Sequence, residues 1–128
     1  IRNSRKHNII NIVNDIVKSN DIIVSENLNV KGMSKNHNLA KSIIDASFNM
    51  ICNMLKWKTT IQGKYYYQVD TFYPSSKTCS RCGTKTDITN NLSVRKWTCK
   101  NCGNENDRDI NASINIMFEG LKLHYKTI

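Results

Sequence analysis

The stretch that decides the fold reads Cys79-Ser80-Arg81-Cys82-Gly83 and, with sixteen residues between the two cysteine pairs, Cys99-Lys100-Asn101-Cys102-Gly103. Two Cys-x-x-Cys pairs at this spacing predict a tetrahedral zinc site, because each pair places two thiolates on one tight turn and the intervening hairpin brings the turns together. The glycine after each pair supports this prediction, since the tight turn that holds such a cysteine pair, here called a knuckle, needs a residue with positive φ. The alternative is two disulfides, which nothing else in the sequence favours. We expect structural Zn2+ on Cys79, Cys82, Cys99 and Cys102.

The fifth cysteine and the length of the chain limit what else it contains. Cys52 lies in an apolar helical pattern, which indicates a buried free thiol rather than a ligand. The 128 residues make one modest domain, or part of a larger one that carries a small zinc module. The chain begins at Ile1, so we expect a truncated piece. It has neither a membrane-length apolar run nor a signal-type block, which predicts an intracellular protein without a membrane partner.

Positive charge gathers around the two knuckles. The chain has 19 Lys and Arg against 10 Asp and Glu, a net charge of +9, and four thiolates around one divalent ion would remove only two of these charges. Between residues 77 and 100 the basic side chains meet a single acid, Asp87. Phosphate is the natural partner of such a surface. The predicted nucleic-acid contacts are Lys77, Arg81, Arg95, Lys96 and Lys100.

Hydrophobic spacing predicts an α/β chain. Apolar residues at helical spacing indicate helices over about 9–20 and 40–60, and β-branched or aromatic runs indicate strands at 22–24 and 65–69. Residues 76–104 are expected to form one hairpin with its tip at 86–93, and Trp97 to cover the metal site. A last helix should bury the face formed by Ile110, Ile114, Met117 and Leu121.

Two acids stand at the ends of these predicted elements. Glu26 closes the first strand, and Asp109 opens the last helix two residues after Asp107. Each acid also has an ordinary explanation, because most acids are exposed and an acid in a first helical turn stabilises the helix. From spacing alone, exposure without further role is the better explanation for Glu26.

Three separated motifs carry a resemblance to a known family. They are Val24 to Met33, Phe72 to Gly83, and Cys99 onward through Asp107-Arg108-Asp109-Ile110-Asn111-Ala112 to Ile116. Together they resemble the C-terminal part of the TnpB family, the transposon-encoded OrfB proteins, which are similar to type V CRISPR effector nucleases and the eukaryotic Fanzor proteins. The resemblance runs from about Ile9 to Ile116.

The resemblance implies a partial RNase H-like, RuvC-type nuclease core with an inserted zinc ribbon. The implied organisation is a core part at 1–75, the ribbon at 76–104, and the final acidic motif with its helix at 105–128. The family is implicated in RNA-guided DNA cleavage with three acids and divalent metal, usually Mg2+. Glu26 matches the second acid, and Asp109, or its neighbour Asp107, matches the third. DNA and a guide RNA are the implied partners of the complete protein.

One departure from the family pattern bears on activity. The family's first catalytic acid lies upstream of the first helix seen here, so the chain matches two acids of three, and catalytic residues act as a unit. We therefore expect a fragment or a decayed remnant that is inactive alone. Three hypotheses stay open: part of a nuclease, a zinc-ribbon protein that binds DNA or RNA without catalysis, and a structural zinc module in a protein interface. A smaller departure is Ser25, where the family usually has an apolar residue.

Overall fold

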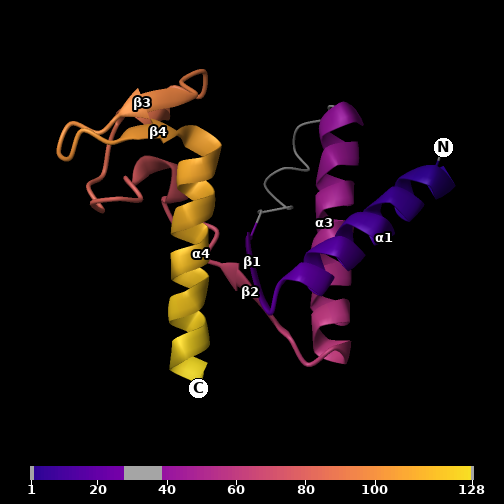
Figure 1. Ribbon diagram of the computed structural model, residues 1–128. Coiled ribbons are helices and arrows are strands. Elements are labelled where there is room, and N and C mark those ends of the chain that lie inside the picture. The colour runs from indigo at the N-terminus through magenta and orange to yellow at the C-terminus, as the bar shows by residue number, and fades with distance from the viewer. Residues whose placement is uncertain (1, 28–38, 128) are drawn as a thin grey trace. The chain divides into compact units, whose positions relative to one another are not determined.

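The computed structural model describes residues 2–27 and 39–127, and residues 2, 3 and 39–41 only by their backbone (Figure 1). From the sequence, Gly32 also predicts a loop at Asn29 to Met33, with a helix start at Ser34 to Asn38, and this segment lies outside the described residues. The chain packs as two compact units, Ile1–Gln68 and Val69–Ile128. The predicted α/β class is confirmed. Among the described helices, none combines the length and the apolar character needed to cross a bilayer.

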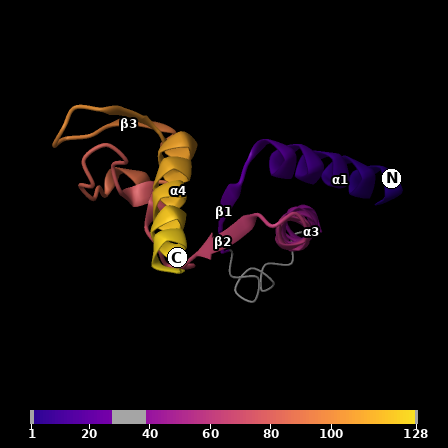
Figure 2. The same ribbon diagram turned by 60° about the horizontal axis from the view of Figure 1, so that its bottom comes forward.

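The first unit contains two helices and a pair of strands. Figures 1 and 2 show helix α1 (Arg2–Ser19) lying across helix α3 (Leu39–Ile61), with strand β1 (Ile22–Glu26) beside strand β2 (Tyr65–Val69). The predicted helices and strands are confirmed, and β1 extends to include Glu26. The end of each helix has a recognisable cause. Asn20 Nδ2 and Lys64 Nζ donate to the last carbonyls of α1, and Gly63, with φ of 67°, ends α3.

The core of the first unit is small and apolar. Its buried members are Ile9, Val13, Val17, Ile23 and Leu55. Ile9, Val13 and Val17 give α1 the buried face that its helical spacing predicts, although Ile12, in the same pattern, is 50% exposed. The helical spacing over 40–60 also predicts a core-packing face of α3, and this prediction is wrong in the first described turns of that helix. Ile43 and Ile44 are 37% and 66% exposed, and from residue 42 onward the first buried residue of α3 is Cys52. The reason is that α1 and the strands cover only the later turns of this 23-residue helix within the unit.

The second unit is built on two short hairpins and a long helix. Its regular elements are η1 (Ser75–Lys77), η2 (Ile88–Asn90), β3 (Lys96–Thr98), β4 (Glu105–Asp107) and α4 (Arg108–Thr127). Strands β3 and β4 pair antiparallel, with Trp97 opposite Asn106. The second knuckle is the turn between them.

The ribbon is not the single hairpin that the sequence predicted. The first knuckle lies at the tip of its own hairpin, whose arms pair through the bridge between Thr78 and Lys85 and through the Thr86 N–H to Lys77 carbonyl bond of 2.8 Å. Residues 86–93, predicted as the hairpin tip, instead connect the two knuckle hairpins and contain η2. Each knuckle hairpin makes its backbone hydrogen bonds between its own two arms. Residues 86–93 are therefore not needed as arms of a larger hairpin.

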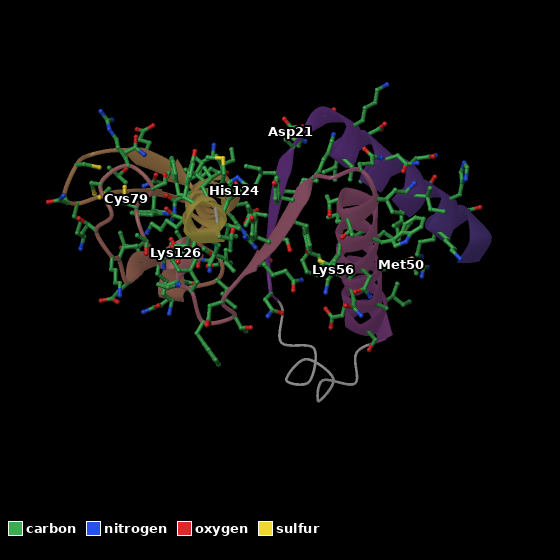
Figure 3. All side chains as sticks on the ribbon, turned by 90° about the horizontal axis from the view of Figure 1, so that it is seen from below. Asp21, Met50, Lys56, Cys79, His124 and Lys126 are labelled. Atoms are coloured by element: carbon green, nitrogen blue, oxygen red, sulfur yellow. The ribbon has the colours of Figure 1, made fainter. Side chains whose placement is uncertain are left out.

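Helix α4 buries a mostly polar stripe, and the predicted apolar face is covered only in part, with Ile114 and Leu121 half-buried. Ile110 and Met117, predicted to face the core, are 62% and 45% exposed. The buried positions are Asn111, Asn115, Gly120 and His124. Figure 3 looks along α4 and labels His124. The asparagine amides turn inward because they bind backbone carbonyls ahead of the first knuckle.

Candidate metal centre

Four cysteine sulfurs meet between the two knuckles. The Sγ atoms of Cys79, Cys82, Cys99 and Cys102 all lie within 4.8 Å of one another. The Cys79–Cys102 and Cys82–Cys99 distances are 3.7 and 3.6 Å. A tetrahedron with Zn–S bonds of about 2.3 Å has edges of ~3.8 Å, so these sulfurs fit the ligand set of a zinc ion.

The alternative of two disulfides is wrong. All five cysteines lie in the described part of the chain and each is a free thiol. The observed separations of 3.6 and 3.7 Å far exceed an S–S bond of about 2.05 Å. Cys52 is buried in the first unit and does not belong to the cluster, as predicted.

The two knuckles repeat one backbone design. Gly83 has a φ of 79° and donates to the Cys79 carbonyl at 2.8 Å, and Gly103 has a φ of 73° and donates to the Cys99 carbonyl at 2.9 Å. A side chain in this left-handed region would cost conformational energy, which explains the glycine after each cysteine pair.

The buried side of the centre is closed by one aromatic ring and one amide. Trp97 is 6% exposed and packs with Cys79 and Cys99, so its predicted place over the metal site is confirmed. Asn106, on the facing strand, lies 3.7 Å through Nδ2 from the Cys79 Sγ, and Asn104 Nδ2 donates to its Oδ1 at 2.7 Å. Amides that donate to a ligand sulfur stabilise the thiolate and hold it in place. Sequence reasoning missed Asn106, because an isolated asparagine carries no spacing signal.

The thiols of the cluster differ in pKa. Hydrogen bonds from the Thr84 and Asn101 side chains and the Thr84 backbone lower the pKa of Cys82 to about 5. At Cys102 a backbone hydrogen bond from Asn104 acts in the same direction, but desolvation and the three neighbouring sulfurs outweigh it and raise the pKa to about 11. At Cys79 desolvation by burial raises the pKa, but hydrogen bonds from the backbone of Cys82 and Arg81 and from the Asn106 side chain outweigh it and lower the pKa. The site therefore favours the thiolates of Cys79 and Cys82, and a bound cation would stabilise the remaining thiolates by offsetting their repulsion.

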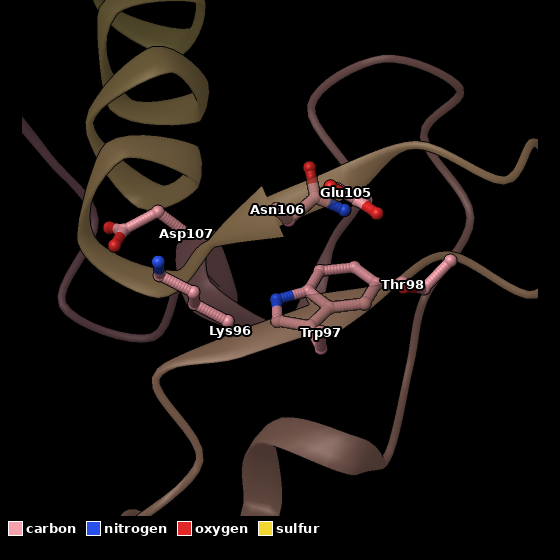
Figure 4. Close-up of a pocket in the computed structure, with 6 residues that line it drawn as sticks. All are labelled: Lys96, Trp97, Thr98, Glu105, Asn106 and Asp107. Carbon is pink, nitrogen blue, oxygen red and sulfur yellow. The ribbon is translucent and has the colours of Figure 1, made fainter.

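A cavity of about 440 Å³ lies along the strand pair beside the metal centre (Figure 4). Its lining residues are Lys96, Trp97, Thr98, Glu105, Asn106 and Asp107. Lys96 stands directly across from Asp107 in the strand register, so this cavity has mixed charge and no excess of cations.

The two candidate acids near α4 have different tasks. Asp107 Oδ1 accepts hydrogen bonds from the N–H groups of Asp109 and Ile110 at 3.0 and 3.1 Å, which makes Asp107 the N-cap of the helix. The Asp109 carboxylate is 84% exposed, and its ion pair is with Arg95 at 3.7 Å. Glu26 is exposed at the end of β1 in the first unit, whereas Asp109 belongs to the second.

Arg108, between the two acids, holds the connection between the knuckles. Its Nη1 lies 3.0 Å from the Thr89 carbonyl, 3.2 Å from that of Asn91 and 3.4 Å from that of Val94. Its backbone N–H donates to the Arg95 carbonyl at 2.8 Å. Sequence reasoning treated this arginine only as part of a motif, because its partners are carbonyls that any residue would provide.

The predicted nucleic-acid contacts fall into two groups. Arg95 pairs with Asp109, and Lys96 lies opposite Asp107. Lys77, Arg81 and Lys100 are exposed, and among the described residues none of these three has an ion-pair partner. Each knuckle of this unit therefore carries one exposed cation without an ion-pair partner among the described residues, Arg81 in the first and Lys100 in the second.

Residues 48–116, which include both knuckles and the start of α4, match the family described as Cas12f1-like, TNB domain. The chain belongs to the TnpB/Cas12f-like family. The family predicted from the three sequence motifs is thus confirmed.

Relatives of this TnpB/Cas12f-like chain include several curated proteins. It is 41% identical over 106 residues to a Streptomyces pristinaespiralis protein named "Putative RNA-guided DNA endonuclease", covering 83% of this chain and 26% of the relative. Two Mycobacterium tuberculosis proteins of the same description are 30% identical over 122 residues, which is 91% of this chain and 26% of theirs. The chain therefore spans about a quarter of the length of these relatives.

A solved structure supports the fold. The chain superposes with a TM-score of 0.59 and 21% identity on a protein in the "Cryo-EM structure of the Cas12f1-sgRNA-target DNA complex". The match covers 89% of this chain and 32% of that one. At this identity the likeness shows a Cas12f1-like fold.

Proposed function

We propose that this chain is the portion of an RNA-guided DNA endonuclease that binds nucleic acid beside a zinc centre and contributes two carboxylates to a RuvC-type catalytic site. The observation that carries the proposal is the tetrahedral cluster of four cysteine sulfurs, whose knuckles hold Arg81 and Lys100 exposed. The reaction class is that for which the relatives are named, RNA-guided cleavage of DNA.

Zinc is the metal proposed for the four cysteines. Four thiolates at tetrahedral spacing suit a structural zinc ion, which leaves no open position for substrate. The ion would hold the two knuckle hairpins together, because each hairpin closes its own backbone hydrogen bonds and few bonds link one to the other. The role of the centre is then to fix the shape of a nucleic-acid-binding surface.

Nucleic acid is proposed to contact the free cations of the two knuckles. Arg81 lies between the ligands Cys79 and Cys82, and Lys100 between Cys99 and Cys102. Because the metal fixes both turns, these charges are held at a set separation and pay little ordering entropy on meeting phosphate. Lys77 adds a third unpaired charge, whereas Arg95 and Lys96 have acidic neighbours.

Glu26 and Asp109 are proposed as ligands of catalytic Mg2+. Both are exposed carboxylates, and Asp109 is the better ligand of its pair because Asp107 Oδ1 already caps α4. Hard oxygen ligands suit Mg2+, and bound Mg2+ would stabilise the attacking water and the leaving oxygen of a phosphodiester. Since the family's set has three acids and this chain matches two, cleavage is proposed only for a protein that supplies the third.

A second candidate is a zinc-centred binding module without catalysis. The ion pair between Arg95 and Asp109 favours it, because the carboxylate then has a partner other than a metal. The two candidates agree on nucleic-acid binding and differ on Asp109.

The binding part is tested with the 128-residue chain and single-stranded or duplex DNA at several salt concentrations. Arg81→Gln and Lys100→Gln should each weaken binding and reduce the slope of log K against log salt by roughly 0.7–0.9. Lys126→Gln, at the far end of α4, is the matched control and should leave the slope unchanged. An affinity that does not change with salt would remove the phosphate contacts.

The catalytic part needs a protein of the relatives' full length that carries this segment, together with its guide RNA. Glu26→Ala and Asp109→Ala should abolish cleavage and preserve DNA binding. Asp107→Asn keeps a good helix cap, so it should preserve cleavage if Asp109 is the ligand. Full cleavage by both Glu26→Ala and Asp109→Ala would favour the module without catalysis, whereas cleavage that is lost in Asp107→Asn but not in Asp109→Ala would make Asp107 the ligand.

A further inference from the structure

The start of helix α4 is tied to both halves of the metal centre. On one side, strand β4 follows directly from the second knuckle and ends in Asp107, the cap of the helix. On the other side, the buried amides of Asn111 and Asn115 reach the chain around the first knuckle. Asp109 lies between these two attachments.

The bonds from Asn111 join the helix directly to the first knuckle. Asn111 Oδ1 accepts the N–H of Ser80, between the ligands Cys79 and Cys82, at 2.8 Å, and its Nδ2 donates to the Thr78 carbonyl at 2.7 Å. Asn111 is only 2% exposed. A buried amide that satisfies both an N–H and a carbonyl fixes its partner segment, because loss of either bond leaves a buried polar group unpaired.

One turn later, Asn115 repeats the contact. Its Nδ2 donates to the carbonyls of Ser75 and Thr78, both at 2.8 Å, and the residue is 6% exposed. Asn111 and Asn115 are four residues apart and therefore lie on one face of α4. Together they hold the segment 75–80, which leads into the first pair of cysteines.

We propose that Asn111 and Asn115 are positioning residues that couple the zinc centre to Asp109: a zinc ion that locks the two knuckles fixes the first turns of α4, and the docked helix tightens zinc binding. This inference rests on the proposed function only in giving Asp109 a catalytic task. The coupling is reciprocal, so the factor by which zinc stabilises the docked helix equals the factor by which docking strengthens zinc binding.

The first measurement is the rate at which the zinc-loaded 128-residue chain releases zinc to a colorimetric chelator. Asn111→Ala and Asn115→Ala should release zinc about 10- to 100-fold faster, the range found when residues that orient metal ligands are removed. Asn111→Asp keeps the acceptor for Ser80 but sets a buried carboxylate oxygen against the Thr78 carbonyl, so it should release zinc at least as fast as Asn111→Ala. Ser113→Ala, exposed on the same helix, is the control and should release zinc at the wild-type rate.

The second measurement is amide hydrogen exchange of the wild-type chain with and without zinc. Zinc removal should speed exchange over residues 108–116, and the amides of α1 should not respond. In Asn111→Ala that still binds zinc, this response of the first turns of α4 should be lost. A purely structural asparagine would instead lower protection with and without zinc to the same extent.

The outcomes separate the coupling from the proposed function. Wild-type zinc release by both alanine variants, or exchange at residues 108–116 that ignores zinc, would overturn the coupling. If Asn111→Ala fails to fold, the wild-type exchange measurement still decides. Zinc-dependent protection together with full cleavage by Asp109→Ala in the longer protein would retain the coupling and reject the catalytic task.

Discussion

The Arg95 guanidinium lies 3.7 Å from the Asp109 carboxylate, Nη1 to Oδ1, so a predicted phosphate contact and a predicted metal ligand form one ion pair. Both side chains are mostly exposed, at 65% and 84%. Exposed pairs contribute about 0–1 kcal/mol, which a divalent cation can readily replace. The ion pair with Arg95 therefore weakens cation binding at the Asp109 carboxylate without preventing it.

Removing this arginine should strengthen Mg2+ binding at Asp109. Because the competing pair is weak, the gain for Arg95→Gln should not exceed about fivefold. The measurement is an NMR titration of the Asp109 amide with Mg2+. Lys122→Gln, which breaks the exposed pair with Glu119 further along α4, is the control and should not change the response. An Asp109 signal that ignores Mg2+ in every variant would contradict the metal-ligand assignment.

The cysteine cluster predicts a strict division among five thiols. Each of Cys79→Ser, Cys82→Ser, Cys99→Ser and Cys102→Ser should lose tight zinc binding, since a structural site needs all four ligands. Cys52→Ser should keep one zinc per chain. Metal analysis after gel filtration checks this, and full zinc in any of the four variants would remove that residue from the site. Chelation should unfold the ribbon before the helices of the first unit, because zinc binding energy is folding energy.

Arg108 is expected to stabilise the connection between the knuckles. Arg108→Met removes the guanidinium near three carbonyls, and hydrogen bonds to charged groups contribute about 1.5–3 kcal/mol. The free energy of unfolding of the zinc-loaded chain in urea should fall by about that amount. Arg108→Lys should recover only part of it, because an ammonium lacks the planar fork. Arg5→Met in α1 is the control, and equal losses in both methionine variants would contradict the role given to Arg108.

The raised pKa of Tyr66 predicts that the first unit loses stability at alkaline pH. Burial and the nearby Cys52 thiol raise the pKa of Tyr66 from 10.0 to about 12, although a hydrogen bond with Ser25 at 2.7 Å opposes the shift. The folded state thus holds the proton more tightly than the unfolded state. The resulting stability is complete below pH 10 and is lost as the pH rises to about 12.

Urea unfolding between pH 9 and 12 measures this loss. Tyr66→Phe should be less stable at neutral pH by about 1 kcal/mol, for the lost hydrogen bond, but should lose less stability between pH 10 and 12. Tyr65→Phe, on the same strand and half exposed, should keep the wild-type pH dependence. Identical pH dependence in Tyr66→Phe and the wild type would show that Tyr66 has no such linkage.

The structure explains how the strand accommodates a polar residue at position 25. Ser25 stands where the family usually has an apolar residue, yet its Oγ finds the Tyr66 hydroxyl from the neighbouring strand. A half-buried hydroxyl with a partner costs little. The departure therefore leaves β1 intact and Glu26 at its end.

The sequence by itself determined the cysteine quartet, the glycine after each pair, the family and the approximate extent of the helices and strands. These features follow from local spacing and residue type: two residues between paired thiols, a glycine where positive φ is needed at 83 and 103, apolar residues at helical intervals, and β-branched or aromatic runs. Each depends on neighbours in the chain, so a pattern of residue types is enough to predict it.

Tertiary structure alone decided which face of α4 is buried, which acid caps it and how the knuckles are joined. The apolar spacing of Ile110 and Met117 identified a real face, but the buried face belongs to Asn111 and Asn115. Their partners are carbonyls of residues 75–78, more than thirty positions away, and every residue has such a carbonyl. Hydrogen bonds to backbone leave no mark on the partner's sequence, so only the folded chain shows where they form.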